Sequence, residues 1–353
     1  MTVELGIVGL GSIGRRHAHQ LREHADAFDS VLVGGMDVDP AARDHFTAAF
    51  EVPTYADAAS LYGACDAVLV TTPNRFHEEH AVAALEAGLD VLLEKPLAHT
   101  LESAERIANT AREAPGFCTV GFQARFEPAV EILRAYQRDG RLGEVYHVEA
   151  NYLRRRGVPG MGSWFTDRET AGGGALVDVG VHALDLGLHV LGFPAVEEVS
   201  GTARSQFGGR DDYAYLQMWG PEGNGTFDVD DSVTAFVRCA AGKTLTLEVS
   251  WAANREPNHD VVVRGTEGGA ALDVHDGDLT LYESSKAGGD HHADTTVETR
   301  EEDAHVAEKR RFVEAVRAGE PPERNTVEQA LTVQRVVDAI YRSSERGRAV
   351  ELE

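Results

Sequence analysis

Lysine is scarce in this sequence of 353 residues, where it occurs only as Lys95, Lys243, Lys286 and Lys309. Acidic residues number 58 against 33 lysines and arginines, which gives a formal net charge of -25. Proteins that bind nucleic acids or anionic membranes need a basic footprint, and none is visible in this strongly acidic sequence. The charge balance therefore argues against nucleic acids and anionic membranes as partners of this protein.

Cysteine is also rare, and Cys65, Cys118 and Cys239 lie far apart along the chain. An odd number at such spacing argues against a disulfide framework and against a thiolate metal cluster. The longest apolar stretches have the length of strands, well short of the roughly 20 residues that cross a bilayer, and no charged-then-apolar leader opens the chain. We expect a soluble protein of the reducing cytoplasm.

The acidic excess is spread over the whole chain and accompanies Asp-rich, Lys-poor usage. This composition resembles that of proteins from salt-loving organisms, in which concentrated cations screen the repulsion between carboxylates. We expect a halophilic protein whose fold needs high salt, with an ordinary acidic protein as the alternative.

The length of the chain predicts two domains, each with its own core. In the first third, apolar runs alternate with amphipathic stretches, which indicates a parallel sheet covered by helices on both faces. The predicted strands are 5–10, 31–37, 66–72, 89–96 and 116–122, and the predicted helices are 14–25, 40–50, 76–88 and 100–113.

After residue 122 the pattern changes to many alternating strands in succession, which indicates a mainly antiparallel sheet. We expect strands at 197–206, 213–219, 232–240, 243–251, 259–265 and 278–283, helices at 128–138, 175–191, 303–318 and 326–346, and a mobile loop at 284–303. The predicted fold is α/β: a doubly wound Rossmann domain of residues 1–122, followed by an α+β domain of residues 123–353 with a large mixed sheet.

The sequence GLGSIG at residues 9–14 is a G-x-G-x-x-G motif between a predicted strand and a predicted helix. Gly9 permits the tight turn, Gly11 lets the backbone approach a pyrophosphate, and Gly14 lets the helix pack on the strand. The helix start at Ser12 and Ile13 offers unpaired N–H groups to phosphates. The motif in this context predicts a dinucleotide site.

The identity of the dinucleotide depends on Asp37, which ends the second predicted strand. Its carboxylate can accept hydrogen bonds from the adenosine ribose, whereas a 2'-phosphate would meet its negative charge. Arg43 on the next predicted helix could instead bind such a phosphate. We therefore expect NAD, with NADP as the alternative.

Several motifs occur in order along the chain: GLGSIGRRH, TTPNRFH (71–77), EKPLA (94–98), GFQARFEP (121–128) and GGGALVDVGVHALDL (172–186). Taken together they resemble one known family, that of glucose-fructose oxidoreductase, inositol dehydrogenase and the rhizopine-catabolism proteins (Gfo/Idh/MocA). The resemblance covers most of the chain and implies an oxidoreductase of sugars or cyclitols, without specifying the substrate.

The resemblance also implies a set of cofactor-binding residues. Glu94 would accept hydroxyls of the nicotinamide ribose, Lys95 would project toward the reacting carbon, and the Lys95-Pro96 bond would be cis. The other residues implied at the cofactor are Thr72, Pro73, Asn74, His77 and Gln123.

Lys95 has a chemical rationale of its own. Oxidation of a secondary alcohol requires the hydroxyl proton to leave, and an ammonium near that oxygen stabilises the charge that develops. The alternative is that Lys95 is a surface charge that pairs with Glu94.

A second group of polar residues, Asp178, His182, Asp185 and His189, recurs at spacings of four, three and four on one predicted helical face. By the resemblance, His182 is the general acid and base, and Asp178 polarises it or holds the substrate. Histidine suits this role because its pKa lies near neutrality. The four side chains could instead bind a divalent metal, but the family chemistry needs none, and we expect Asp185 and His189 to be structural.

Three further residues are candidates for binding the substrate. Arg154 and Arg156 share one side of a predicted strand and either grip an anionic group of the substrate or pair with the acidic surface. Trp164 either stacks on a sugar face or belongs to the core. The remaining notable histidines are expected to be solvated: His17, His19, His291 and His292.

Together these observations predict an NAD(P)-dependent oxidoreductase that transfers a hydride between nicotinamide and a hydroxyl carbon of a sugar, a cyclitol or a derivative. Lys95, Asp178 and His182 are the expected catalytic residues, and no metal is expected. The alternatives are a non-catalytic sensor of nucleotide and sugar, or an oxidoreductase that recycles a tightly held cofactor. The broad sheet resembles the oligomer surface of the family, so we expect a homodimer or homotetramer.

Overall fold

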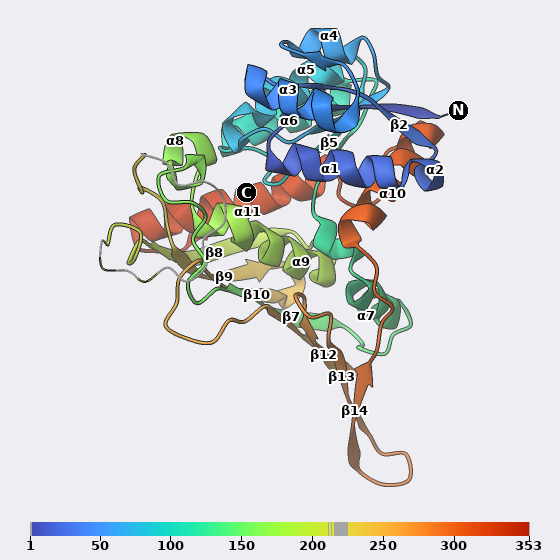
Figure 1. Cartoon of the computed structure of the whole chain (residues 1–353). Helices are drawn as coiled ribbons and strands as arrows, with labels where there is room; N and C mark the ends of the chain where they lie inside the picture. The colour runs from blue at the N-terminus through green and yellow to red at the C-terminus, as the bar shows by residue number, and fades with distance from the viewer. Residues whose placement is uncertain (1, 211, 213, 215–224, 353) are drawn as a thin grey trace. The chain divides into compact units, whose positions relative to one another are not determined.

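The structure is a computed structural model that describes residues 2–210, 212, 214 and 225–352 (Figure 1). The chain forms two compact units: Met1–Phe122 with His305–Gln334, and Gln123–Ala304 with Arg335–Glu353. The return of the segment His305–Gln334 to the first unit is a feature that the order of strands and helices along the sequence does not reveal. The strand expected at 213–219 lies outside the described residues.

In the first unit, the described residues form a six-stranded parallel sheet of order β3-β2-β1-β4-β5-β6, as the sequence predicts for a Rossmann fold. Its strands are β1 (Val3–Val8), β2 (Ser30–Met36), β3 (Thr54–Tyr55), β4 (Ala67–Val70), β5 (Asp90–Leu93) and β6 (Cys118–Val120). Its helices are α1 (Ser12–Glu23), α2 (Ala25–Phe28), α3 (Pro40–Phe50), α4 (Ala58–Tyr62), α5 (His77–Glu86) and α6 (Leu101–Glu113), with a 3-10 turn η1 (Asn74–Phe76).

Alternation along β1 directs side chains to both faces of this sheet. Leu5 and Ile7 join a buried cluster with residues of α1, α3 and the C-terminal helix α10 (Ala304–Ala318). Gly6 points to the opposite face, where Leu61 of α4 lies 3.1 Å from the position that a Cβ would take. Because both faces are covered, the strands can be apolar throughout, as their sequences are.

In the second unit, the described residues form a nine-stranded sheet of order β14-β13-β12-β11-β7-β10-β9-β8-β15. The pair β7 and β10 is parallel and the other pairs are antiparallel, which confirms the mixed, mainly antiparallel sheet. The strands are β7 (Val145–Leu153), β8 (Val196–Arg204), β9 (Ser232–Cys239), β10 (Thr244–Ser250), β11 (Asp260–Gly265), β12 (Gly268–Asp273), β13 (Leu279–Ser285), β14 (His291–Val297) and β15 (Val350–Glu351).

The helical elements of this part of the chain are η2 (Gln123–Phe126), α7 (Pro128–Arg138), η3 (Trp164–Thr166), α8 (Arg168–Ala171), the π-helical turn η4 (Leu176–Gly180), α9 (Val181–Leu191) and η5 (Ala240–Gly242). The last helix, α11 (Val327–Arg346), runs from the first unit into the second.

The mobile loop expected at 284–303 is wrong for residues 284–297, which belong to a β-hairpin. Residues Leu279–Ser285 and His291–Val297 pair over seven positions as the hairpin of β13 and β14, which projects from the sheet (Figure 1). The residues of β14 are mostly exposed, so its sequence lacks the apolar alternation that reveals a half-buried strand.

One face of the nine-stranded sheet is covered by helices (Figure 1). In α9, a Cβ on Gly187 would lie 2.4 Å from Leu245 of β10, and in α11 the Ser343 hydroxyl accepts the N–H of Gly201 in β8 at 3.0 Å. The helical segment Arg168–Leu191 is long enough to span a membrane, and its most apolar 18-residue window has a mean hydropathy of 1.4, but 94% of that window is buried inside the protein. The apolar stretch therefore makes the core of the second unit, and the expectation that all such stretches are strand-sized is wrong here.

A buried ion pair joins η2 to α9. Arg125 has no exposed surface, and its guanidinium binds both carboxylate oxygens of Asp185, which is 1% exposed. The same guanidinium lies 4.9 Å from the ring centre of Phe193. The pair explains why a charge is tolerated in the middle of an apolar helix, because each ion satisfies the other.

A buried histidine joins two loops of the first unit. The Nδ1 atom of His77 lies 2.9 Å from the carbonyl oxygen of Pro96, and its Nε2 atom lies 3.0 Å from that of Thr72. Burial lowers the pKa of His77 from 6.5 to about 4, although both carbonyls favour the charged ring. The ring is therefore neutral near pH 7, where it can donate to only one of the two carbonyl oxygens at a time, and it lies between the loops that follow β4 and β5.

Replacement of Arg125 by Met should lower the free energy of unfolding by about 3–5 kcal/mol, because it leaves a buried carboxylate without a partner. The double variant Arg125→Met/Asp185→Leu should recover most of this loss. Arg112→Met breaks a half-exposed pair with Glu328 and should cost less than about 1 kcal/mol. Equal losses in chemical denaturation for the buried and exposed pairs would contradict the assignment.

Stability should also depend on pH through His77. In the unfolded chain the ring takes up a proton as the pH falls through 6.5, whereas in the fold it does so only near 4, so stability is lost across this window. The loss from this ring between pH 7.5 and 4.5 should be about 2–3 kcal/mol. His77→Asn should flatten that slope in denaturant titrations, and His19→Asn, at an exposed position of α1, should leave it unchanged.

Candidate active-site residues of the two units

The three glycines of residues 9–14 differ in what surrounds them. A Cβ on Gly9, whose φ is +93°, would lie 2.9 Å from the backbone of Thr71 and Thr72, and one on Gly14 would lie 2.0 Å from the carbonyl oxygen of Gly9. A Cβ on Gly11 would meet no described atom within 4 Å. Gly9 and Gly14 are thus required by the fold, whereas Gly11 leaves open space at the start of α1 that a pyrophosphate fits.

The Asp37 carboxylate is fixed beside the glycine loop. One oxygen accepts the N–H of Leu10 at 2.8 Å and the other accepts that of Asp39 at 2.9 Å. The Arg43 guanidinium donates to the carbonyl oxygens of Asp37 and Val38 at 2.7 and 3.1 Å. Each carboxylate oxygen keeps a second acceptor site, which suits the hydroxyls of a ribose.

A cavity of about 620 Å³ lies at the carboxyl end of β2. Val38, which is 78% exposed, lines it, and Ile13 of α1 is 42% exposed. Exposed apolar side chains beside a fixed carboxylate fit the adenosine half of a dinucleotide. The lining residues include Met36, Val38, Asp57, Tyr62, His80 and Ala83.

The residues implied at the nicotinamide lie on the loops after β4 and β5. Thr72 and Pro73 are half-buried and Asn74 is buried, and the Thr72 hydroxyl has no hydrogen-bond partner among the described residues. The Lys95-Pro96 bond is cis, as expected. Lys95 is half-buried and is therefore not a fully solvated surface charge.

Glu94 and His17 form a pair at the end of β5. The Nε2 atom of His17 lies 2.7 Å from a carboxylate oxygen of Glu94, whose other oxygen accepts the N–H of Lys95 at 3.3 Å. Burial alone would raise the pKa of Glu94, but the hydrogen bond with His17 and the nearby charge of Lys95 lower it well below its usual range. The expectation of a solvated His17 is wrong, since the ring is buried. His19, on the other side of α1, is exposed as expected.

In the second unit, Asp178 lies within the π-helical turn Leu176–Gly180 and is 8% exposed. The indole N–H of Trp251 donates to its Oδ2 atom at 2.9 Å, and the Arg154 guanidinium lies 4.0 Å from the same oxygen. Trp251 has no exposed surface. The carboxylate is thus held between a buried donor and a cation that is partly exposed.

His182 is the single residue of α9 that is not buried. Asp185 is engaged by Arg125, and His189 is buried, so both have the structural environment expected of them. No cluster of three metal-ligating side chains occurs among the described residues. The four polar residues of this helix do not converge as a metal site would require.

The other candidate residues of this unit are partly exposed. Arg156 donates to Asn254 and lies 5.2 Å from the ring centre of Phe207, whereas Arg155 points to the exposed Glu256. Trp164 in η3 stacks on Phe165 with 3.8 Å between ring centres and keeps some exposed surface. Gln123 begins η2 and is half-buried.

The roles of two residues in these sites, His17 and Trp251, were not predicted from the sequence. The buried face of α1 consists of Gly14, His17, Ala18 and Leu21. Helical spacing from Gly14 could therefore have placed His17 inward. Trp251 follows the apolar strand β10 and only the fold brings it to Asp178, which lies 73 residues away in sequence.

Comparison with known proteins agrees with this geometry. The family described as "Oxidoreductase family, NAD-binding Rossmann fold" matches residues 3–122, and the GFO/IDH/MocA C-terminal domain matches residues 130–271. The D-glucoside 3-dehydrogenase of Escherichia coli (strain K12) is 36% identical over 289 residues, which cover 81% of this chain and 79% of that protein.

Solved structures show the same fold. The structure of GenD2 from gentamicin A biosynthesis in complex with NAD is 26% identical, with a TM-score of 0.78 and coverage of 99% of this chain and 96% of that one. Levoglucosan dehydrogenase in complex with NADH and levoglucosan has a TM-score of 0.86 over 100% of both chains at 22% identity, a likeness of fold alone. The glycine loop, the fixed Asp37 and these matches together show that the chain belongs to the Gfo/Idh/MocA family of oxidoreductases, with an NAD-binding first domain.

Proposed function

We propose that this chain transfers a hydride between nicotinamide and a hydroxyl-bearing carbon of a sugar, a cyclitol or one of their derivatives. The observation that carries the proposal is the environment of His182. It alone keeps exposed surface on an otherwise buried helix, four residues after a carboxylate that is held by buried and cationic donors. A partly exposed imidazole on the same helical segment as a fixed carboxylate is suited to exchange a proton.

The dinucleotide supplies the hydride acceptor when it is bound. Oxidation of an alcohol also requires the hydroxyl proton to leave, and we assign this proton to His182, with Asp178 orienting the ring. The Lys95 ammonium stabilises the negative charge that develops on the substrate oxygen. These assignments rest on the residue types, on their partial burial and on the family motifs that contain them.

We assign the phosphates of the dinucleotide to Gly9, Gly11, Ser12, Ile13 and Gly14, because the open space above Gly11 adjoins the start of α1. The fixed carboxylate of Asp37 would receive the adenosine ribose and repel a 2'-phosphate, which favours NAD over NADP.

We assign the nicotinamide half to the loops after β4 and β5 and to Gln123. Glu94, held ionised by its neighbours, is suited to accept ribose hydroxyls. His77 has no exposed surface and supports the two loops from beneath. The remaining contacts are Thr72, Pro73 and Asn74.

The substrate is expected to be rich in hydroxyl groups. Arg154 and Arg156 offer guanidiniums that can donate to such groups or to an anionic substituent, and Trp164 offers an aromatic face for sugar C–H surfaces. Relatives of this chain include a D-glucoside 3-dehydrogenase, a levoglucosan dehydrogenase and an inositol 2-dehydrogenase, which supports a polyol or sugar substrate.

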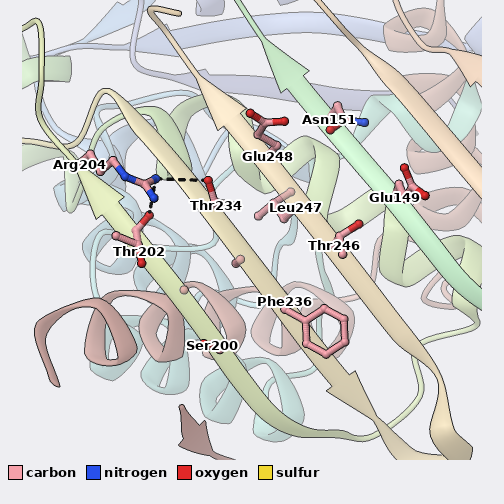
Figure 2. A pocket seen from close by; sticks show the side chains of 12 residues that line it. Glu149, Asn151, Ser200, Thr202, Arg204, Thr234, Phe236, Thr246, Leu247 and Glu248 are labelled. Carbon is pink, nitrogen blue, oxygen red and sulfur yellow. Dashed lines mark hydrogen bonds between the residues drawn. The ribbon is translucent and has the colours of Figure 1, made fainter. Parts of the chain in front are cut away.

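We also propose that the open face of the nine-stranded sheet joins copies of this chain into a homodimer or homotetramer. Figure 2 shows this face across β7, β8, β9 and β10, where hydroxyl and charged side chains lie together with Phe236. A shallow cavity of about 470 Å³ lies on it. The Arg204 guanidinium donates to the Thr234 hydroxyl at 3.2 Å and to the Thr202 carbonyl oxygen at 3.4 Å, which keeps this cation flat against the strands.

Two further proposals concern the surroundings of the protein. Cys65, Cys118 and Cys239 are free thiols, and burial raises the pKa of each, which fits a reducing cytoplasm. The net charge of -25 supports a halophilic fold in which salt screens carboxylate repulsion. Thermal unfolding is therefore to be measured in dilute buffer and in molar KCl, where the higher salt should give the higher melting temperature.

The hydride transfer is tested by incubating the chain with NAD or NADP and a panel of polyols, glycosides and aldoses while following the absorbance of the reduced cofactor. Lys95→Met and His182→Asn should each lower kcat about 10²- to 10⁴-fold and leave the Kd of NADH within a few-fold. Lys286→Met removes an exposed lysine and should keep full activity.

Binding of NADH without turnover of any compound by the wild type would contradict the enzyme and favour a sensor. Cofactor that co-purifies and turns over only with two sugars together would indicate a recycled nucleotide.

The assembly is tested by light scattering after size exclusion. Thr234→Arg places an unpaired charge in the open face and should shift the wild-type oligomer toward the monomer, raising its dissociation constant at least about tenfold. Val31→Arg, at an exposed position of the first unit, adds the same charge and should leave the mass unchanged. A wild type that is monomeric at micromolar concentration would remove the proposal.

A further inference from the structure

Two consecutive buried aspartates, Asp230 and Asp231, immediately precede β9. They are 3% and 0% exposed. A buried carboxylate destabilises a fold unless hydrogen bonds or charges compensate it, so both residues need a physical reason. The catalytic assignments above do not use either of them.

Asp230 caps the helical segment that leads to Asp178. Its Oδ1 atom accepts the N–H of Gly174 at 2.9 Å, its Oδ2 atom accepts that of Leu176 at 3.0 Å, and its carbonyl oxygen accepts that of Ala175 at 2.9 Å. A helix start leaves such N–H groups unpaired, and here one distant residue satisfies three in succession. The negative charge also suits the positive end of the helix.

The fit around this cap is close. The hydroxyl of Tyr341 in α11 donates to Asp230 Oδ1 at 2.7 Å. A Cβ on Gly173 would lie 2.1 Å from the Tyr341 hydroxyl oxygen, and one on Gly174 would lie 1.8 Å from the Asp230 carbonyl oxygen. The glycines of the GGG sequence therefore make room for this contact.

Asp231 fixes the other side of Asp178. Its carbonyl oxygen accepts the backbone N–H of Trp251 at 2.9 Å, and the Trp251 indole N–H donates to Asp178 Oδ2 at 2.9 Å. Its carboxylate accepts the N–H groups of Gln206 and Phe207 at 2.7 and 2.6 Å. The dipeptide Asp230-Asp231 thus fixes both the backbone that precedes Asp178 and the indole that binds the Asp178 side chain.

We propose that Asp230 and Trp251 are positioning residues for the Asp178 carboxylate, a role that rests on the proposed function of Asp178. Asp178 lies in a π-helical turn, which has one residue more than an α-helical turn. If the capped end were released, relaxation to α-helix would rotate the following side chains by about 100°. Asp230 holds the turn, and Trp251 holds the side chain that it presents.

The first test uses Asp230→Asn and Trp251→Phe. Asn cannot accept from both Gly174 and Leu176, and Phe keeps most of the ring while it removes the N–H. Each variant should lower kcat about 10- to 100-fold, leave the Kd of NADH within twofold, and shift the pH profile of kcat in the same direction as Asp178→Asn.

The second test is epistasis. In an Asp178→Asn background, Asp230→Asn and Trp251→Phe should each lower kcat by less than about twofold, because their target is already removed. Asp228→Asn is the matched control, since Asp228 is exposed and caps α8 through the N–H of Arg168 at 2.8 Å. It should leave kcat and the pH profile unchanged.

A third readout needs neither cofactor nor activity. The chain has three tryptophans, so the indole N–H resonance lost in Trp251→Phe identifies that of Trp251 in NMR spectra. This resonance should move in Asp178→Asn and also in Asp230→Asn, where the carboxylate leaves the indole. A folded Asp230→Asn protein with an unmoved resonance, or losses of kcat that multiply fully in the Asp178→Asn background, would overturn the proposal. An inactive wild type in which the resonance moves as expected would instead refute only the proposed function.

Discussion

Burial of α9 on nearly every side is the constraint on which the second unit depends. A helix surrounded by protein must find partners for its polar side chains and for its backbone ends within the fold. The Arg125 guanidinium pairs with the Asp185 carboxylate, and the Lys243 ammonium donates a hydrogen bond to the carbonyl oxygen of Leu191 in the last turn of α9. These contacts fix the helix, and they thereby fix the direction in which its one partly exposed side chain, His182, points.

In the first unit, it is the backbone of the loops at the edge of the sheet that has to be held in place. Parallel strands bring their carboxyl ends to one edge, where the loops have to be held in place before a ligand arrives. Two glycines allow the first loop to touch its neighbours directly, His77 ties the loops after β4 and β5, and His17 holds the Glu94 carboxylate. A site organised in this way loses less conformational freedom when the dinucleotide binds.

The sequence predicts the parallel sheet of the first unit and most elements of the second, because half-buried or fully buried strands impose an apolar pattern. It fails for β12 and β14, where Gly268, Gly269 and an exposed run replace that pattern. Family motifs supply the candidate residues Lys95, Asp178 and His182. Neither the apolar pattern nor the family motifs point to Asp230. Its role depends on a hydrogen bond with Gly174, which lies 56 residues away in sequence, and no local pattern predicts such a contact.

The positions of the four lysines suggest why lysine is so scarce in this chain. Lys309 is fully buried and donates to a glutamine side chain and a backbone carbonyl, and Lys243 donates at the end of α9. Only Lys286 is exposed, in the turn of the β13 and β14 hairpin. Arginine supplies nearly all other positive charge, and its planar guanidinium is not interchangeable with the compact ammonium of a lysine. Lys95, half-buried after β5, follows the same pattern, so its retention is better explained by a task for a compact cation than by solubility.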